Sequence, residues 1–234
     1  MKRYYGCIAV LLMVSQSVLP VLKLIALFFG WQLSVLNGLA FAVPMAVVSV
    51  TAAAIYIKGK GDADIGKCEC FCTSIALPLS LIDFLILPAF QSVAMVVATV
   101  VNCLGCLAIY LCCRGSKGLR KFTTIAAVAL TVAVVGVSLL HVVFSDFGIT
   151  EVVRSEASPD GTYTANVINI DQGALGGDSV VRVQRLKLFG IPLDDVVCLD
   201  RRVWLGDWGT THLIGMHWVD DDTLMIEGEE QDFH

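Results

Sequence analysis

The stretch from Thr73 to Cys113, TSIALPLSLIDFLILPAFQSVAMVVATVVNCLGCLAIYLCC, decides how many times this chain crosses a membrane. It is about 40 residues long and contains a single charged residue, Asp83, whereas a helix needs only roughly 20 apolar residues to cross the hydrocarbon core. A single span of this length would need an unusual tilt, and a proline and a glutamine lie near its middle. The stretch is therefore predicted to be a helical hairpin, with spans at about 73–90 and 92–113.

Three further apolar runs have the length of a membrane span. They cover residues 7–30, 33–57 and 122–144, and only the first contains a charged residue, Lys23. The whole chain is 56% hydrophobic and 16% charged, whereas a soluble globular chain carries about 25% charged residues. Residues 1–144 are therefore predicted to form five helices in a lipid bilayer. The first run is longer than the apolar part of a cleavable signal peptide, so we expect it to remain as a span.

Lysine and arginine residues flank these spans on one side only. They precede the first span, separate the second from the third and separate the fourth from the fifth, whereas the connections near residues 30–32 and 90–92 contain no base. Short loops rich in basic residues stay in the cytoplasm. The pattern predicts a multi-pass protein of the cell membrane with a cytoplasmic N-terminus and an extracytoplasmic C-terminal domain. A single crossing by residues 73–113 would place two of the basic groups on opposite faces.

After residue 144 the pattern changes to short β-type runs separated by turn residues. The segment from Ser158 to Gly161, Ser-Pro-Asp-Gly, has the composition of a tight turn. We therefore predict a small all-β domain over residues 145–234, able to fold when expressed alone, with Trp218 as its most sensitive residue. The candidate strands are 151–156, 162–170, 179–189, 196–204, 213–219 and 224–227.

The predicted β-domain is strongly acidic. It holds 17 acidic and six basic residues, which gives a formal net charge of −11. Nucleic acid is therefore an unsuitable partner, because its phosphates attract lysine and arginine. A ligand or protein of the cell envelope is the partner class that we expect for residues 145–234.

Three short motifs stand out in the C-terminal domain. They are Ser158-Pro159-Asp160-Gly161-x-Tyr163, then Gly173-Ala174 with Asp178-Ser179-Val180, and finally Trp218-x-Asp220-Asp221-x-Thr223-Leu224. Together they resemble a family of uncharacterised bacterial membrane-attached proteins. The resemblance covers about the last 85 residues and implies no activity.

Two charged residues interrupt the apolar spans, Lys23 in the first and Asp83 in the third. An ionisable side chain within a membrane costs several kcal/mol unless it is paired or hydrated, so each is a candidate functional residue. Both are predicted to lie about 10–13 Å below the outer surface, where a pair would neutralise both charges. The alternative is structural, with Lys23 extending to the interface and the polar backbone near Pro88 holding Asp83.

Five cysteines gather at the predicted cytoplasmic face. Thiolate clusters bind soft metals, but a C-x-C-x-C run without histidine is not the spacing of a common zinc site. We interpret these residues chiefly as reduced thiols beside the membrane, and only weakly as metal ligands. They are Cys68, Cys70, Cys72, Cys112 and Cys113.

Small residues recur at four-residue spacing in two of the spans, which lets helix backbones approach closely. This spacing predicts helix packing. The residues are Gly38, Ala42 and Ala46 in the second span, and Ala94, Ala98, Asn102 and Cys106 in the fourth.

The chain contains no Ser/His/Asp set, zinc-peptidase motif or nucleotide-binding loop, so we expect neither enzyme activity nor a cofactor. Two functions remain. In the first, the helices anchor an outer β-domain that acts as a binding or interaction module at the cell envelope. In the second, the protein is a small transporter with an intramembrane site at Lys23 and Asp83. The orientation of these two side chains separates the two hypotheses.

Overall fold

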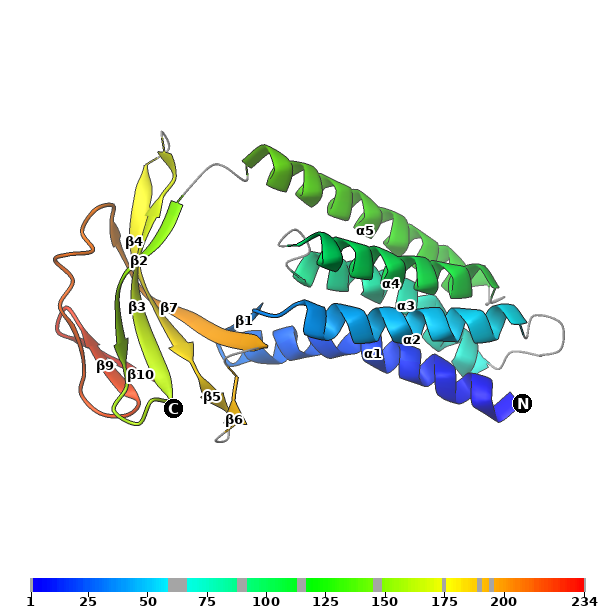
Figure 1. The fold of residues 1–234 in the computed structure, drawn as a ribbon, viewed down its shortest axis with the longest axis horizontal. Helices are drawn as coiled ribbons and strands as arrows, with labels where there is room; N and C mark the ends of the chain where they lie inside the picture. Colours follow the sequence, from blue (N-terminus) through cyan, green and yellow to red (C-terminus); the bar gives the residue numbers. More distant parts are fainter. Residues whose placement is uncertain are drawn as a thin grey trace. The chain divides into compact units, whose positions relative to one another are not determined.

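The computed structural model describes residues 2–58, 67–87, 92–112, 117–144, 149–173, 176–188, 191–193 and 196–233. The chain forms two compact units, whose helices and strands are drawn in Figure 1. The helical unit comprises Met1–Leu24 and Asn37–Leu140, and the β unit comprises Ile25–Leu36 and His141–His234. The β unit therefore includes a short segment from the N-terminal part of the chain, beyond the predicted range 145–234.

Within the described residues, five helices are long and apolar enough to cross a membrane, as the sequence predicts. The run from Thr73 to Cys113 contains two of them, and the residues that connect them, 88–91, lie outside the described part of the chain. The helices are α1 (Lys2–Phe28), α2 (Leu39–Lys58), α3 (Lys67–Ile86), α4 (Val93–Cys112) and α5 (Lys117–Phe144).

Helices α2 and α4 pack closely through small residues. A Cβ atom placed on Gly105 of α4 would lie 2.7 Å from the Ser49 hydroxyl oxygen of α2, so only glycine allows this approach. The small-residue stripes of the sequence lie largely in this packing, because Ala42, Ala46 and Ala98 are buried. Ala94 at the beginning of α4 is exposed, so the stripe is buried only from Ala98 onward.

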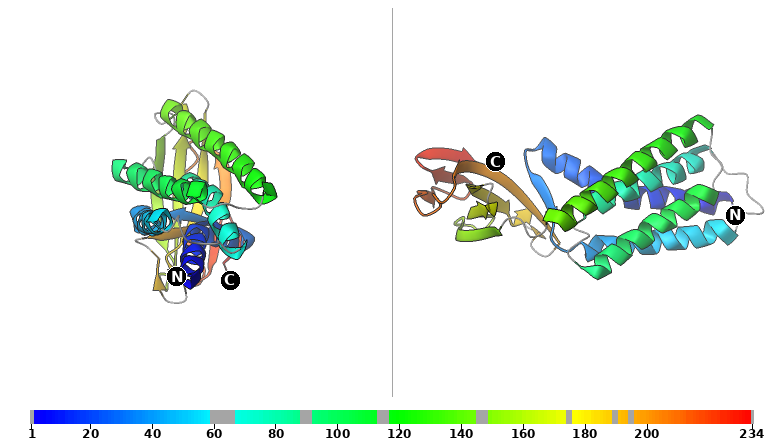
Figure 2. Two further views of the ribbon diagram at one scale, coloured as in Figure 1. Left: turned by 90° about the vertical axis from the view of Figure 1, so that its right-hand side faces the viewer. Right: turned by 90° about the horizontal axis from the view of Figure 1, so that it is seen from above.

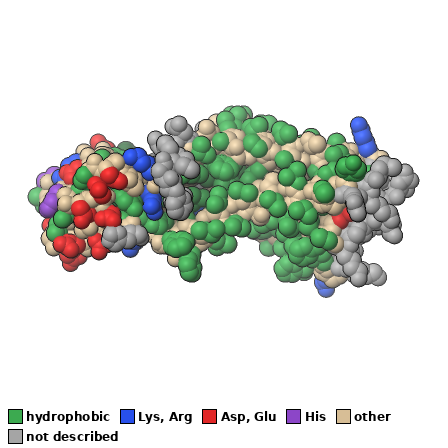
Figure 3. Space-filling view, turned by 90° about the horizontal axis from the view of Figure 1, so that it is seen from below, with side chains coloured by type: hydrophobic (Ala, Val, Ile, Leu, Met, Phe, Trp, Pro, Cys, Tyr) green, Lys and Arg blue, Asp and Glu red, His purple; other side chains and the backbone are tan. Residues whose placement is uncertain are grey.

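Helix α5 makes few contacts with the other helices of its unit. Almost none of its membrane-crossing residues are buried, and both views of Figure 2 show it diverging from α4 along its length. The Tyr110 hydroxyl of α4 lies 2.6 Å from the Thr124 hydroxyl and connects the two helices near the beginning of α5. Apolar side chains cover the helical unit on the face drawn in Figure 3, as hydrocarbon surroundings require.

The connection between α1 and α2 contains a β-strand that the sequence analysis did not predict. Residues 33–35 were assigned to the beginning of the second span, but β1 (Gln32–Val35) pairs antiparallel with β7 (Val197–Asp207). Its side chains alternate between exposed and buried, with Leu33 and Val35 buried. Hydrophobicity alone does not distinguish four such residues from the end of the apolar run that follows them. This is why the sequence assigned residues 33–35 to the second span.

Antiparallel pairing joins β1 to the C-terminal strands in one five-stranded sheet, in the order β1-β7-β4-β3-β2. A second sheet has three strands in the order β10-β9-β8, and two short strands form a separate pair. This confirms the predicted β region after the helices, which the structure shows to be antiparallel. The remaining strands are β2 (Ile149–Ala157), β3 (Tyr163–Asp171), β4 (Gly177–Arg185), β5 (Lys187–Leu188), β6 (Ile191–Pro192), β8 (Met216–Trp218), β9 (Thr223–Ile226) and β10 (Glu229–Asp232).

An aromatic cluster lies in the core of the β unit. Trp31, which precedes β1, is 8% exposed and stacks on Tyr163, with ring centroids 6.1 Å apart. Trp218 stacks on the same tyrosine at 6.1 Å, and Phe233 contacts all three rings. The Tyr163 hydroxyl donates to the Phe233 carbonyl oxygen at 2.8 Å, which satisfies its polar group inside the core. The core therefore includes a side chain from the α1–α2 connection.

The predicted Ser158–Gly161 turn is present. Asp160 accepts hydrogen bonds from the Thr162 hydroxyl, from the Thr162 backbone N–H at 2.8 Å and from the Ser158 hydroxyl at 2.7 Å. These bonds, those of Thr162 first, lower the pKa of Asp160 to about 2. Gly161 adopts φ +66, a conformation that glycine accepts without steric cost.

Candidate functional site

Asp83 is a buried carboxylate without a partner. Its side chain on α3 is 1% exposed, and in the described part of the chain neither of its oxygen atoms accepts a hydrogen bond. Helix α3 ends three residues later at Ile86, so Asp83 lies about 5 Å from the end of its helix at 1.5 Å per residue. The depth of 10–13 Å below the outer surface stays a prediction, since it counted the third span to residue 90 and residues 88–91 lie outside the described part of the chain.

Lys23 is exposed on the surface of α1. The two ion pairs among the described residues are Arg154–Glu156 and Arg182–Asp200, both in the β unit. No cation of the described part of the chain thus pairs with Asp83, and the proposed pair with Lys23 is not formed. An exposed lysine near a helix end fits the alternative in which its side chain extends to the interface.

A polar pair in the helical unit was missed by the sequence analysis. The side chains of Gln16 on α1 and Asn102 on α4 are buried and exchange two hydrogen bonds, at 2.8 and 3.2 Å. Each residue lies near the middle of its helix. Such reciprocal bonding satisfies both amides where water is absent, and it fixes the register of α1 against α4. The signal that could have found it is a glutamine in the middle of an otherwise apolar span.

We expect Gln16→Leu and Asn102→Leu each to destabilise the helical unit, because each removes both hydrogen bonds between the two buried amides. The double variant should lose less than the sum of the single losses, with a coupling of about 0.6–1.7 kcal/mol. Thermal unfolding of the four proteins in one detergent measures this coupling. Additive losses would show that the two amides do not bond to each other.

The cysteines at the predicted cytoplasmic face lie on helices rather than in a loop. Cys68, Cys70 and Cys72 belong to the first turns of α3, where Cys70 and Cys72 are buried and Cys68 is exposed. Cys112 ends α4, and Cys113 lies outside the described residues. Across the described ranges, no three His, Cys, Asp or Glu side chains are arranged to hold a metal ion.

A buried acid begins α3 next to these cysteines. The Tyr56 hydroxyl of α2 lies 2.9 Å from a carboxylate oxygen of Glu69 and 3.1 Å from the backbone carbonyl oxygen of Tyr5. These contacts join α1, α2 and α3 at one end of the helical unit. Glu69 therefore contributes to the packing of these three helices.

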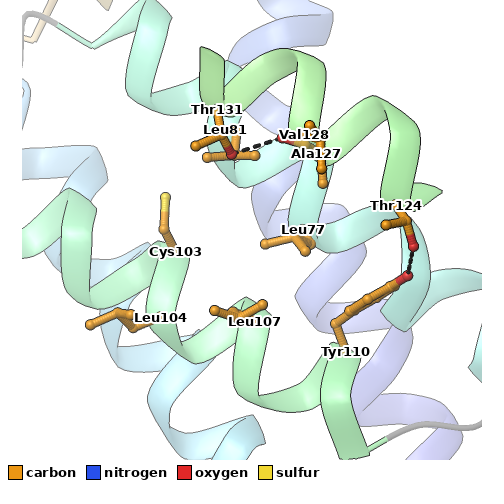
Figure 4. A pocket seen from close by; sticks show the side chains of 10 residues that line it. All are labelled: Leu77, Leu81, Cys103, Leu104, Leu107, Tyr110, Thr124, Ala127, Val128 and Thr131. Atoms are coloured by element: carbon orange, nitrogen blue, oxygen red, sulfur yellow. Dashed lines mark hydrogen bonds between the residues drawn. The ribbon is translucent and has the colours of Figure 1, made fainter. Parts of the chain in front are cut away.

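Helices α3, α4 and α5 enclose an apolar groove of about 290 Å³ (Figure 4). Leucine side chains of α3 and α4 point into it, and the Tyr110–Thr124 hydrogen bond closes one end. The Thr131 hydroxyl on α5 donates to the Ala127 carbonyl oxygen of its own helix, so it presents no free donor. Apart from the Cys103 thiol and three hydroxyls, the groove is lined by apolar side chains, which suits hydrocarbon.

The β unit contains a second, more polar cleft of about 240 Å³, which we call the Trp204 cleft. It lies between the end of β7, the connection to β8 and the turn between β9 and β10. A Cβ atom on Gly206 would collide with the Trp204 ring, so the glycine lets this ring fold over the strand. The lining residues are Trp204, Gly206, Asp207, Thr210, Leu213, Ile214 and Glu227.

Hydrogen bonds hold the walls of the Trp204 cleft. Thr210 donates its hydroxyl to the Asp207 carbonyl oxygen at 2.7 Å and its backbone N–H to the Ser179 hydroxyl at 3.2 Å. A Glu227 carboxylate oxygen accepts the Gly215 N–H, and the Glu227 N–H donates to the Gly215 carbonyl oxygen at 2.9 Å. These bonds connect the walls of the cleft, which is lined by one tryptophan, two large apolar residues and two acidic residues.

Comparison with known proteins gives no assignment for this arrangement. No family model, no curated protein and no solved structure matches the chain significantly. The resemblance of the C-terminal motifs to membrane-attached bacterial proteins therefore stays a prediction.

Proposed function

We propose that this protein anchors an extracytoplasmic binding module in the cell membrane. In this proposal the five helices cross the bilayer, the N-terminus is cytoplasmic, and the β unit binds a ligand or protein of the cell envelope through the Trp204 cleft. The observation that carries the proposal is the pairing of β1 with β7. This pairing supports five membrane crossings. It also supports a β unit that is assembled from two separate parts of the chain.

The pairing constrains the number of membrane crossings. Strands β1 and β7 share one sheet, so both must be on the same side of the membrane. Helices α2, α3, α4 and α5 lie between them along the chain, and an even number of crossings returns the chain to the side where it began. A single crossing by residues 73–113 would give an odd number. The pairing thus supports five spans by an argument independent of the basic residues.

The basic residues indicate which side is cytoplasmic. In a cysteine-free version with single reporter cysteines, we expect an impermeant thiol reagent added outside intact cells to label Ser155→Cys but not Gly61→Cys. Permeabilised cells provide the control in which both positions react. Equal labelling in intact cells would contradict the proposed topology.

A photo-reactive amino acid tests the binding role directly. Placed at Leu213, which is 69% exposed at the cleft, it should give a specific crosslinked product in intact cells. Placed at Val219, which is 52% exposed and does not line the cleft, it should not give that product. The same product from both positions, or from neither, would count against the cleft as the binding surface.

The alternative function, a small transporter, is favoured by one observation. Asp83 is buried among the helices without a partner, which is unusual unless the residue serves a purpose. The exposed position of Lys23 speaks against the two-residue site. The two functions differ in whether water reaches position 83, which the reaction of Asp83→Cys with a water-soluble thiol reagent measures.

A further inference from the structure

We propose that the Trp204 cleft binds a basic side chain, an arginine or lysine, of a partner protein. This inference rests on the proposed binding function of the β unit and names the chemistry of its ligand. It follows from the charge, the shape and the aromatic wall of the cleft.

The charge of the cleft is negative and uncompensated. Asp207 and Glu227 line it, and Asp178 faces Asp207 across the β4–β7 pair as its direct register partner. The two ion pairs formed by described residues involve none of these three acids. Like charges directly opposite each other destabilise a sheet, so Asp178 adds to the unrelieved negative charge next to the cleft.

The size of the cleft favours a single side chain. Pockets for drug-sized molecules usually have volumes of about 300–1,000 Å³, and this cleft has about 240 Å³. Leu213 and Ile214 offer an apolar surface for an aliphatic stem, and the Trp204 ring offers a face for a cation. Arginine and lysine combine such a stem with a terminal positive charge.

The Glu227 side chain is held at the cleft by a tight turn and a hydrogen bond. Glu227 and Gly228 form the two-residue turn between β9 and β10, where Ile226 pairs with Glu229. Both residues have positive φ, at 52° and 85°, as the common two-residue hairpin turn requires. The Glu227 carboxylate accepts the Gly215 N–H through one oxygen, which fixes it beside the cleft.

Peptide binding to the full-length protein tests the inference. The protein is placed in nanodiscs of phosphatidylcholine, which has no net charge, and titrated into a fluorescent Gly-Arg-Gly-Arg-Gly peptide. Fluorescence anisotropy should show saturable binding, with a Kd at least about tenfold lower than that of the matching glutamine peptide, a difference of about 1.4 kcal/mol. Equal binding of the two peptides, or no binding of the arginine peptide, would overturn the inference.

Matched variants locate the site. Asp207→Asn should raise the Kd about fivefold, and Trp204→Leu about two- to fivefold. Asp221→Asn removes the same charge from an exposed position outside the cleft and should leave the Kd unchanged. If Asp221→Asn weakens binding as much as Asp207→Asn, the attraction is only that of an acidic surface, and the site assignment fails. A specific crosslink from position 213 in the same experiments would still support the proposed binding function of the β unit.

Discussion

Trp31→Ala should unfold or greatly loosen the β unit, although the residue lies more than 100 positions before most of that unit in the sequence. Its indole is 8% exposed and contacts Tyr163 and Phe233. Replacing a buried tryptophan with alanine typically costs about 3–5 kcal/mol, a large part of the stability of a small domain. We expect limited proteolysis of membranes to cleave between residues 149 and 233 at least about tenfold faster in the variant.

The matched control is Trp208→Ala. Trp208 belongs to the same unit and is 52% exposed, so its removal should cost about 1 kcal/mol or less. Both variants lose the same indole, which separates the effect of burial from that of composition. Wild-type protease resistance in Trp31→Ala would mean that the α1–α2 connection does not contribute to the core.

The second large effect concerns the C-terminal segment expressed without the helices. We expect residues 145–234 alone to be largely unfolded, in contrast to the expectation from the sequence that this segment folds by itself. The isolated segment lacks β1, which leaves β7 as an unpaired sheet edge, and it lacks Trp31 and Leu33 from the core. A domain of this size is marginally stable even when complete.

Restoring the missing segment provides the control. Residues 29–36 joined to the N-terminus of residues 145–234 through a flexible Gly/Ser linker should give a cooperative thermal transition and dispersed amide resonances. The same fusion with Trp31→Ala should not. A folded segment without residues 29–36 would show that the strands after residue 145 are sufficient.

The helical part of the fold could be predicted because its signal is local. Each span is a run of about 20 apolar residues, and even the hairpin in residues 73–113 follows from its length alone. β1 could not be predicted in this way. Its partner strand lies far along the chain, with Ser34 bonded to Asp200 across 166 positions, and its four residues resemble the beginning of the span that follows.

The candidate sites were predictable only in part. The intramembrane charges of Lys23 and Asp83 were evident, because charge within an apolar run is conspicuous. Their separate environments, one exposed and one buried, depend on how the helices pack. The Gln16–Asn102 pair joins residues 86 positions apart. The Trp204 cleft combines three segments of the β unit, and no spacing in the sequence indicates that Asp207 and Glu227 line the same cleft.

A cross-strand disulfide tests most directly whether β1 completes the C-terminal sheet. Ser34 and Cys198 are register partners, and antiparallel partners have Cα atoms about 4.5–5.5 Å apart, within the range for a disulfide. Ser34→Cys is made in a chain that keeps Cys198 and no other native cysteine, and membranes are treated with a mild oxidant. Burial, and then the nearby Asp200 charge, raises the pKa of the Cys198 thiol to about 11, so a mildly alkaline buffer is used.

The paired strands predict an intramolecular disulfide in most molecules of Ser34→Cys, detected as a 34–198 crosslinked peptide by mass spectrometry. Gln32→Cys lies two residues out of register with Cys198, where Cα atoms are about 7–8 Å apart, and should crosslink poorly. Absence of the 34–198 disulfide, or equal crosslinking from positions 32 and 34, would contradict the assembly of the β unit from both parts of the chain.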